Sequence, residues 1–268
     1  TSVDLNDGKV NGTDTTGRKY LRSGDIEAES TSIITVEGTT NYGFVVNSNS
    51  NYSKFSITTK DDNMQYGTDK SNGGQINVEG VRSVGFALIK GGISSNSNLI
   101  SVKSDSESSV GFYGEQDEFA NSGTIEVTTT NKKKNIGVVL NGKNSNQKIV
   151  FTNTGNVNMN NNGTAATDGS TNTGVYAIGN YEFNHNSGKN ATGFYVQGAD
   201  GVVNVKAPVN LAESTDGTTI GFYSDGEAKV NFENGSVLNI GNRAVGLYSS
   251  DSEKFNDTFI IKTGEKLN

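Results

Sequence analysis

Residues 225–249 read Asp-Gly-Glu-Ala-Lys-Val-Asn-Phe-Glu-Asn-Gly-Ser-Val-Leu-Asn-Ile-Gly-Asn-Arg-Ala-Val-Gly-Leu-Tyr-Ser. The stretch holds three short apolar pieces with roughly the every-second-residue spacing of a strand that buries one face. Asn-Gly and Gly-Asn corners separate these pieces, and both residue types turn the backbone at little steric cost. We therefore expect three short strands joined by turns. Such a unit leaves one face and both edges uncovered, so it has to stack on copies of itself.

The copies are visible as a recurring strand in which a Gly precedes Phe, Val or Leu. This strand occurs at Gly43, Gly85, Gly111, Gly137, Gly174, Gly193, Gly221 and Gly246. By subtraction these glycines are 42, 26, 26, 37, 19, 28 and 25 residues apart, and five of the seven spacings lie near the length of one solenoid coil. A second pattern, Phe-x-Asn-x-Gly-x-Ile-x-Val, spans 119–127 and recurs at 151–159 with Val and Met as its last two apolar residues.

These repeats predict a single all-β domain over residues 1–268, folded as a parallel β-helix with three short strands per coil and about eight to nine coils. Residues 1–20 carry few strand signals and are interpreted as an irregular start. Residues 250–268 are interpreted as an incomplete last coil. Because nothing after Ile261 resembles a capping repeat, we expect the chain to be a segment of a longer protein.

The orientation of the recurring strand can be predicted from its apolar columns. The residues directly before and directly after each Gly are mostly apolar, so both are expected to point inward, and Gly itself is expected to point outward. The residue two after each Gly is then also outward, in a ladder with a rung about every 4.8 Å. This column consists of Val45, Ala87, Tyr113, Val139, Tyr176, Tyr195, Tyr223 and Tyr248.

Besides a polar stretch at 60–73, four insertions fall at one corner of the predicted coil, between the Ile-x-Val strand and the Gly strand. They span 103–109, 128–135, 160–172 and 212–219. In stacked repeats, length variation confined to one corner marks a face that can carry recognition. The candidate partner-binding residues are Lys132, Lys133, Lys134, Asn161, Thr164, Asp168, Thr171 and Asp216 in these loops, with Tyr176, Tyr195, Tyr223 and Tyr248 on the ladder.

Each of these candidates has a plain structural interpretation beside the functional one. The three consecutive lysines could steer an anionic glycan or surface, or they could form part of a solvated loop. The tyrosines could stack on one another and cover the neighbouring Gly column, or they could contact a partner, since Tyr is favoured in binding surfaces.

Composition excludes several classes of protein. The chain has 34 Gly, no Cys and 32% hydrophobic residues, which favours an elongated core over a rounded one, with disorder as the alternative. Zero Cys excludes disulfides and thiol-ligated metals. A net charge of −7 argues against nucleic-acid binding. No run approaches the roughly 20 apolar residues of a membrane helix, so we expect no direct membrane insertion of this segment.

No catalytic, metal-binding or cofactor-binding residues are predicted, and we expect a protein that is not an enzyme. Acidic pairs such as Asp225 with Glu227 and Asp251 with Glu253 lie in polar corners, whereas a glycosidase needs one desolvated carboxyl. Weak Ca²⁺ binding at these two pairs remains an alternative. His185 is the only histidine, which leaves little material for a zinc site or a catalytic triad.

The two repeated motifs, in a background rich in Asn, Gly and Lys, resemble the passenger domains of large type V autotransporter adhesins, especially those of fusobacteria. The resemblance covers nearly all of residues 20–262 and concerns the style of the repeat. It implies a right-handed parallel β-helix displayed outside the outer membrane, with a signal peptide and a C-terminal membrane barrel in the full protein. It offers no catalytic motif.

Three functions follow as expectations. The first is a non-enzymatic adhesin or stalk segment at the bacterial cell surface, or secreted after release, which presents corner loops to proteins or glycans on host or bacterial cells. The second is a purely structural spacer, with recognition carried elsewhere in the longer protein. The third is a carbohydrate-active β-helix enzyme, for which loss of polysaccharide turnover on Asp225→Ala would be the sign.

Overall fold

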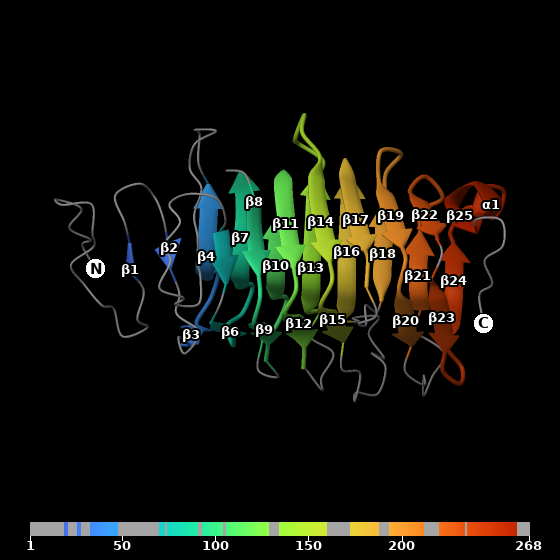
Figure 1. Ribbon diagram of the computed structural model, residues 1–268. Helices are drawn as coiled ribbons and strands as arrows, with labels where there is room; N and C mark the ends of the chain where they lie inside the picture. The colour runs from blue at the N-terminus through green and yellow to red at the C-terminus, as the bar shows by residue number, and fades with distance from the viewer. Residues whose placement is uncertain are drawn as a thin grey trace.

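The computed structural model describes residues 19–20, 26–27, 33–47, 70–72, 74–90, 93–103, 106–128, 134–159, 172–187, 193–211, 220–233 and 235–261. Within these residues the chain winds through three parallel sheets that run side by side along one axis (Figure 1). We name the sheets by their motifs: the Gly-Phe sheet, the Phe-Asn sheet and the Ile-Val sheet. A coil with all three strands visits them in the order Phe-Asn, Ile-Val, Gly-Phe.

The Gly-Phe sheet holds eight described strands, one from each successive coil. They are β4 (Tyr42–Asn47), β7 (Val84–Lys90), β10 (Val110–Gly114), β13 (Ile136–Gly142), β16 (Thr173–Gly179), β18 (Phe194–Gln197), β21 (Ile220–Ser224) and β24 (Val245–Ser249). Every neighbouring pair is parallel, as Phe112 opposite Val138 and Phe194 opposite Phe222 illustrate. The all-β, parallel, coil-by-coil arrangement confirms the predicted architecture.

The Phe-Asn sheet also holds eight described strands. They are β5 (Lys70–Asn72), β8 (Ile93–Asn96), β11 (Asp117–Asn121), β14 (Ile149–Asn153), β17 (Tyr181–His185), β19 (Val202–Val205), β22 (Lys229–Phe232) and β25 (Phe259–Ile261). A helix, α1 (Phe255–Thr258), precedes β25. It was not predicted, although Phe259 and Ile261 do begin a further strand as expected.

The Ile-Val sheet is interrupted. Five strands pair in one part, namely β3 (Ile33–Val36), β6 (Gln75–Val78), β9 (Leu99–Val102), β12 (Thr124–Val127) and β15 (Asn156–Met159). A second part pairs β20 (Pro208–Leu211) with β23 (Val237–Ile240). Among the described residues, the coil between β17 and β18 adds no strand to this face. This coil has the 19-residue glycine spacing found in the sequence, which is too short for three full strands and their turns.

Two strands lie before the first of these coils. β1 (Lys19–Tyr20) and β2 (Ile26–Glu27) pair antiparallel, apart from the stacked sheets. Residues 1–18 of the predicted irregular start lie outside the described residues.

The interior is a continuous column of phenyl and aliphatic side chains. Phe112 and Phe222 are 0% exposed and Phe194 is 2% exposed, as the inward prediction for the residue after Gly requires. Rings from successive coils stack, with centroids 5.0 Å apart for Phe151 and Phe183 and 4.5 Å apart for Phe194 and Phe222. Burial of each such side chain contributes about 1.5–3 kcal/mol to folding, so the column dominates the stability of the stack.

The prediction for the residue before each Gly is wrong. Tyr42 and Val245 are 53% and 38% exposed, and Val84 is half-buried. Gly itself faces inward, because a Cβ on Gly85 would lie 3.1 Å from methyl carbons of both Ile100 and Val78. Two consecutive residues, Gly and Phe, thus face the core, which breaks the strict alternation of a flat strand. The chain bends at Gly as it turns the corner from the Ile-Val sheet.

Candidate functional site

The four predicted insertions leave the stack at one corner. They connect β9 to β10, β12 to β13, β15 to β16 and β20 to β21, so each runs from the Ile-Val face to the Gly-Phe sheet. This confirms their predicted place in the coil. Lys134 is exposed and has a positive φ of 53° at the end of its loop. The other loop candidates, Lys132, Lys133, Asn161, Thr164, Asp168, Thr171 and Asp216, lie outside the described residues.

A ladder of polar residues fixes the base of this loop-bearing corner. The backbone N–H of Ser83 donates to Oγ of Ser109 at 3.0 Å, and the N–H of Ser109 donates to Oδ1 of Asn135 at 2.8 Å. The N–H of Asn135 in turn donates to Oδ1 of Asn172 at 3.0 Å. Asn41 starts the series with a 3.2 Å bond from its N–H to Oγ of Ser83.

The corner ladder has consequences for the loops. Ser83, Ser109 and Asn135 are 0% exposed, so the Ser83–Ser109 and Ser109–Asn135 rungs are buried, satisfied hydrogen bonds that would be costly to break. The first three loops therefore end on a fixed base even where their lengths differ. The ladder was missed from the sequence, although its signal is present: a Ser or Asn stands two residues before each of the first five repeated glycines.

The predicted tyrosine ladder is present over the last four coils of the Gly-Phe sheet. Ring centroids are 5.3 Å apart for Tyr176 and Tyr195, 4.5 Å for Tyr195 and Tyr223, and 5.2 Å for Tyr223 and Tyr248. The rings are nearly parallel, at 20°, 8° and 18°. The face of each ring packs against a neighbouring ring, so only the ring edges point outward. This packing supports the interpretation that the tyrosines stabilise the stack.

The outward column is not exposed throughout, which corrects the sequence prediction. Ala87 is 0% exposed and Val139 is 7% exposed. Ala87 pairs with Val45 on one side and Tyr113 on the other, and these larger side chains cover it. Val139 is flanked in the same way by Tyr113 and Tyr176. Val139 also separates Tyr113 from the tyrosine stack.

Amide and carboxylate groups bind the tyrosine hydroxyls. Tyr113 donates from its hydroxyl to Oε1 of Glu115 at 2.8 Å and accepts from Nδ2 of Asn141 at 2.8 Å. Partial burial raises the pKa of Tyr113 to about 12. Gln197 accepts from the Tyr176 hydroxyl at 3.4 Å and donates from Nε2 to the Tyr195 hydroxyl at 3.3 Å. Burial also raises the pKa of Tyr195, so the phenols of Tyr113 and Tyr195 stay neutral at physiological pH.

A second, internal ladder runs along the inner side of the Phe-Asn sheet. Nδ2 of Asn96 donates to Oδ1 of Asn121 at 2.8 Å, and Nδ2 of Asn121 donates to Oδ1 of Asn153 at 2.7 Å. The Asn of the Phe-x-Asn motif supplies the rungs at Asn121 and Asn153, and Asn96 takes the same place in a coil with Ser94 instead of Phe. All three residues are at most 1% exposed. After His185 the column continues with Val205 and Phe232, so its polar part ends at the histidine.

His185 is the last rung of this internal ladder. Its Nδ1 lies 3.2 Å from Nδ2 of Asn153, and its Nε2 lies 3.0 Å from the carbonyl oxygen of Pro208. Because the carbonyl can only accept, Nε2 carries the proton and Nδ1 accepts from the amide. Burial lowers the pKa of His185, so the ring is neutral at pH 7. Both ring nitrogens are used within the fold, which leaves no nitrogen for a metal in this arrangement.

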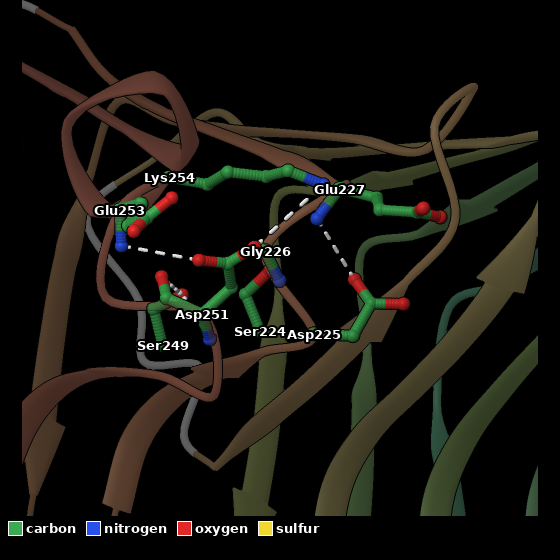
Figure 2. A network of polar contacts seen from close by, with 8 residues as sticks. All are labelled: Ser224, Asp225, Gly226, Glu227, Ser249, Asp251, Glu253 and Lys254. Atoms are coloured by element: carbon green, nitrogen blue, oxygen red, sulfur yellow. Dashed lines mark hydrogen bonds and ion pairs between the residues drawn. The ribbon is translucent and has the colours of Figure 1, made fainter.

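The acidic corners that raised the Ca²⁺ alternative use their carboxylates to hold turns (Figure 2). Oδ1 of Asp225 accepts from the N–H of Glu227 at 3.0 Å, and its Oδ2 accepts from the N–H of Gly198 at 3.2 Å. One coil later, Oδ1 of Asp251 accepts from the N–H of Glu253 at 3.1 Å, and its Oδ2 lies 3.7 Å from Nζ of Lys254.

No group of three or more His, Cys, Asp and Glu side chains that could hold a metal ion occurs in the part of the chain that the structure describes. Glu182, on the outward side of β17, has a pKa lowered chiefly by the hydrogen bond from Asn184 and further by Lys148. A carboxyl that acts as a general acid near neutral pH needs a raised pKa, so Glu182 is not suited to this role.

Of the helices in the described residues, none has the length and apolar character needed to cross a membrane. Comparison of the chain with family models, with curated proteins and with solved structures finds no match.

Proposed function

We propose that this chain is a non-enzymatic adhesin or stalk segment of a type V autotransporter passenger, displayed at the bacterial cell surface or released from it. The coils form a scaffold, and the loops at 103–109, 128–135, 160–172 and 212–219 contact proteins or glycans on host or bacterial cells. The observation that carries this proposal is that all four insertions leave the scaffold at the same corner.

Three features of the corner support a binding role. The insertions vary in length while the polar ladder beneath them keeps its rungs, so sequence change in a loop need not disturb the stack. The first three loops are spaced along the axis by single coils, about 4.8 Å apart where strands pair directly, and the fourth follows two coils after the third. This spacing allows several loops to contact one extended partner. Lys132, Lys133 and Lys134 add a local positive charge to a chain of net charge −7.

The carboxylates favour binding over catalysis. Asp225 holds a turn through both carboxylate oxygens, and Asp251 holds the equivalent turn on the next coil. A glycosidase instead needs two carboxyls that face each other across a cleft, one of them desolvated. The carbohydrate-active alternative would need such a pair.

The binding proposal is tested with fixed mammalian epithelial cells and fixed bacterial cells as probes. Residues 129–133 and 161–171 are each replaced by a short Gly-Ser linker, which keeps the Asn135 and Asn172 rungs. We expect binding to at least one cell type to fall severalfold, while circular dichroism and the urea midpoint stay close to those of the parent chain. Unchanged binding by the variant with both linkers would remove the loop assignment.

A second test asks whether the charge of the three lysines contributes to cell binding, apart from the shape of their loop. The triple variant Lys132→Ala, Lys133→Ala and Lys134→Ala is compared with a control in which the exposed Lys143 and Lys148 of the opposite corner become Ala. We expect only the triple variant to bind cells more weakly, with the difference shrinking as salt rises. Equal loss in both variants would mean that overall charge, not the loop, is responsible.

The second candidate function is a spacer, with recognition carried elsewhere in a longer protein. The hydrogen-bonded and stacked ladders that span several coils favour a stiff rod and require no partner. Absence of binding by this chain to both probe cells, with binding by the longer protein that contains it, would select the spacer.

A further inference from the structure

The central pair of the tyrosine stack is closer and more parallel than its neighbours. Tyr195 on β18 and Tyr223 on β21 have ring centroids 4.5 Å apart and an interplanar angle of 8°. The two residues are direct register partners in adjacent parallel strands (Figure 1). Both are half-buried on the outward side of the Gly-Phe sheet, so their ring edges are within reach of a small oxidant.

We propose that Tyr195 and Tyr223 form an oxidative cross-linking site, at which one-electron oxidation joins the two rings as an intrachain dityrosine. The required co-reactant is a peroxide with a haem peroxidase. Each phenol loses one electron to the peroxidase and one proton from its hydroxyl, which leaves a radical with spin density on the carbons beside the hydroxyl.

The two radicals combine through these carbons to form one carbon–carbon bond. Each ring then loses the hydrogen of the joined carbon as a proton and regains its hydroxyl hydrogen. In total two tyrosines and one hydrogen peroxide give one dityrosine and two water molecules. The two radicals couple rapidly because the fold already holds their rings in contact. No diffusional encounter between two molecules is needed.

The cross-link would lie where the stack is weakest. β18 belongs to the coil that adds no strand to the Ile-Val face among the described residues, so this coil is held to its neighbours by two sheets instead of three. A bond from Tyr195 to Tyr223 fastens that coil to the next one. By subtraction it closes a loop of 28 residues, which removes conformational freedom from the unfolded chain.

The chain contains its own negative controls for this proposal. Tyr113 is separated from the stack by Val139, which stands between Tyr113 and Tyr176 in register. Tyr181 is fully buried in the core, away from the outward column. Tyr176 and Tyr248 flank the central pair at the longer separations of 5.3 Å and 5.2 Å, so they are expected to couple in lower yield.

The test treats the whole folded chain, at low micromolar concentration, with horseradish peroxidase and hydrogen peroxide. We expect dityrosine fluorescence, a product that remains monomeric on a denaturing gel, and an intact mass lower by two hydrogens per cross-link. Peptide mapping is expected to give Tyr195 joined to Tyr223 as the main linked pair. The cross-linked chain should then resist digestion by protease in urea severalfold longer than untreated chain.

Tyr195→Phe and Tyr223→Phe each keep the stacked ring and remove the coupling phenol, so each should lower the intrachain yield at least fivefold. Tyr113→Phe, the matched control, should leave it unchanged. A yield that survives both stack variants, a main linked pair elsewhere in the chain, or cross-links only between molecules would each overturn the proposal. An equal yield from the chain unfolded in urea would overturn it as well, since the folded stack would then play no part.

Discussion

Asn153 and His185 are register partners on adjacent coils, and Nδ2 of the asparagine donates to Nδ1 of the histidine at 3.2 Å. The histidine thus stands where the preceding coils have an asparagine. Each middle amide of the ladder accepts from the preceding rung and donates to the following one, whereas His185 accepts from Asn153 at Nδ1 and donates from Nε2 to the carbonyl of Pro208. His185 therefore ends the ladder with an ionisable group in the dry interior.

This relationship predicts a pH-dependent stability. The folded pKa of His185 is lowered by burial, and protonation of Nδ1 would also put a donor against the Asn153 amide. The unfolded chain binds the proton more tightly, so the stabilising contribution is complete above the unfolded pKa of about 6.5 and is lost as pH falls from there through the folded pKa. Urea midpoints measured from pH 7.5 downward should show this decline.

The matched variant for the pH prediction is His185→Asn, which continues the asparagine column. This variant should fold, and its urea midpoint should not fall between pH 7.5 and about pH 6 as that of the parent chain does. The fall in the midpoint at lower pH, which comes from carboxyl titration, should remain. An identical pH profile for the two proteins would show that His185 does not titrate between the folded and unfolded states as described.

The internal ladder predicts a large penalty for removal of a middle rung. Asn121→Ala leaves the amide of Asn96 without its acceptor and the carbonyl of Asn153 without its donor, in a buried site. Each buried group left unpaired costs about 1–3 kcal/mol. The control is Asn239→Ala, which breaks an exposed 2.6 Å amide pair with Asn210 and should change the free energy of unfolding by less than about 0.5 kcal/mol. Equal urea midpoints for the two variants would contradict the ladder.

The inward glycines predict intolerance to a single methyl group. A Cβ on Gly85 would lie 2.7 Å from the carbonyl oxygen of Gly111, which is backbone and cannot move aside as a flexible side chain can. Gly85→Ala should therefore destabilise the fold by roughly 1–3 kcal/mol, the range of overpacked cores. Thr35→Ala, at an exposed position of β3, is the control in thermal unfolding. A Gly85→Ala variant as stable as this control would restore the outward orientation predicted from the sequence.

Repeats made the architecture predictable. Phe112, Phe194 and Phe222 each directly follow a repeated Gly, and a residue repeated in successive coils occupies the same place in a stack. The position of the insertions followed from the same alignment of motifs. The interruption of the Ile-Val sheet was signalled by the short spacing before Gly193, although the sequence did not indicate which face would lose its strand.

The errors have a physical cause. Val84 and Val110 are apolar, yet they lie half-buried on the outer face of the sheet. In the sequence, an apolar column on a partly covered outer face cannot be told from an apolar column in the interior. The bend at Gly breaks the alternation on which the prediction relied. The sequence shows His185 only as a lone histidine, and its place in the ladder depends on the pairing of β14 with β17, which joins residues 32 positions apart. Partner-binding residues need not recur at a fixed place in each coil, so the repeats of the sequence do not reveal them as they reveal the core.

The most direct test of the parallel, in-register stack is disulfide formation between outward residues of neighbouring coils, since the native chain has no Cys. Asn204 and Asn231 are register partners, and paired Cα atoms in adjacent strands lie about 4.8 Å apart, within the range that a disulfide spans. Asn204 and Lys229 are offset by two residues, about 8 Å apart, beyond that range. Under mild oxidation, Asn204→Cys with Asn231→Cys should close within the monomer and lose both free thiols. Asn204→Cys with Lys229→Cys should stay reduced, and closure of this offset pair in place of the in-register pair would contradict the stacked-coil account.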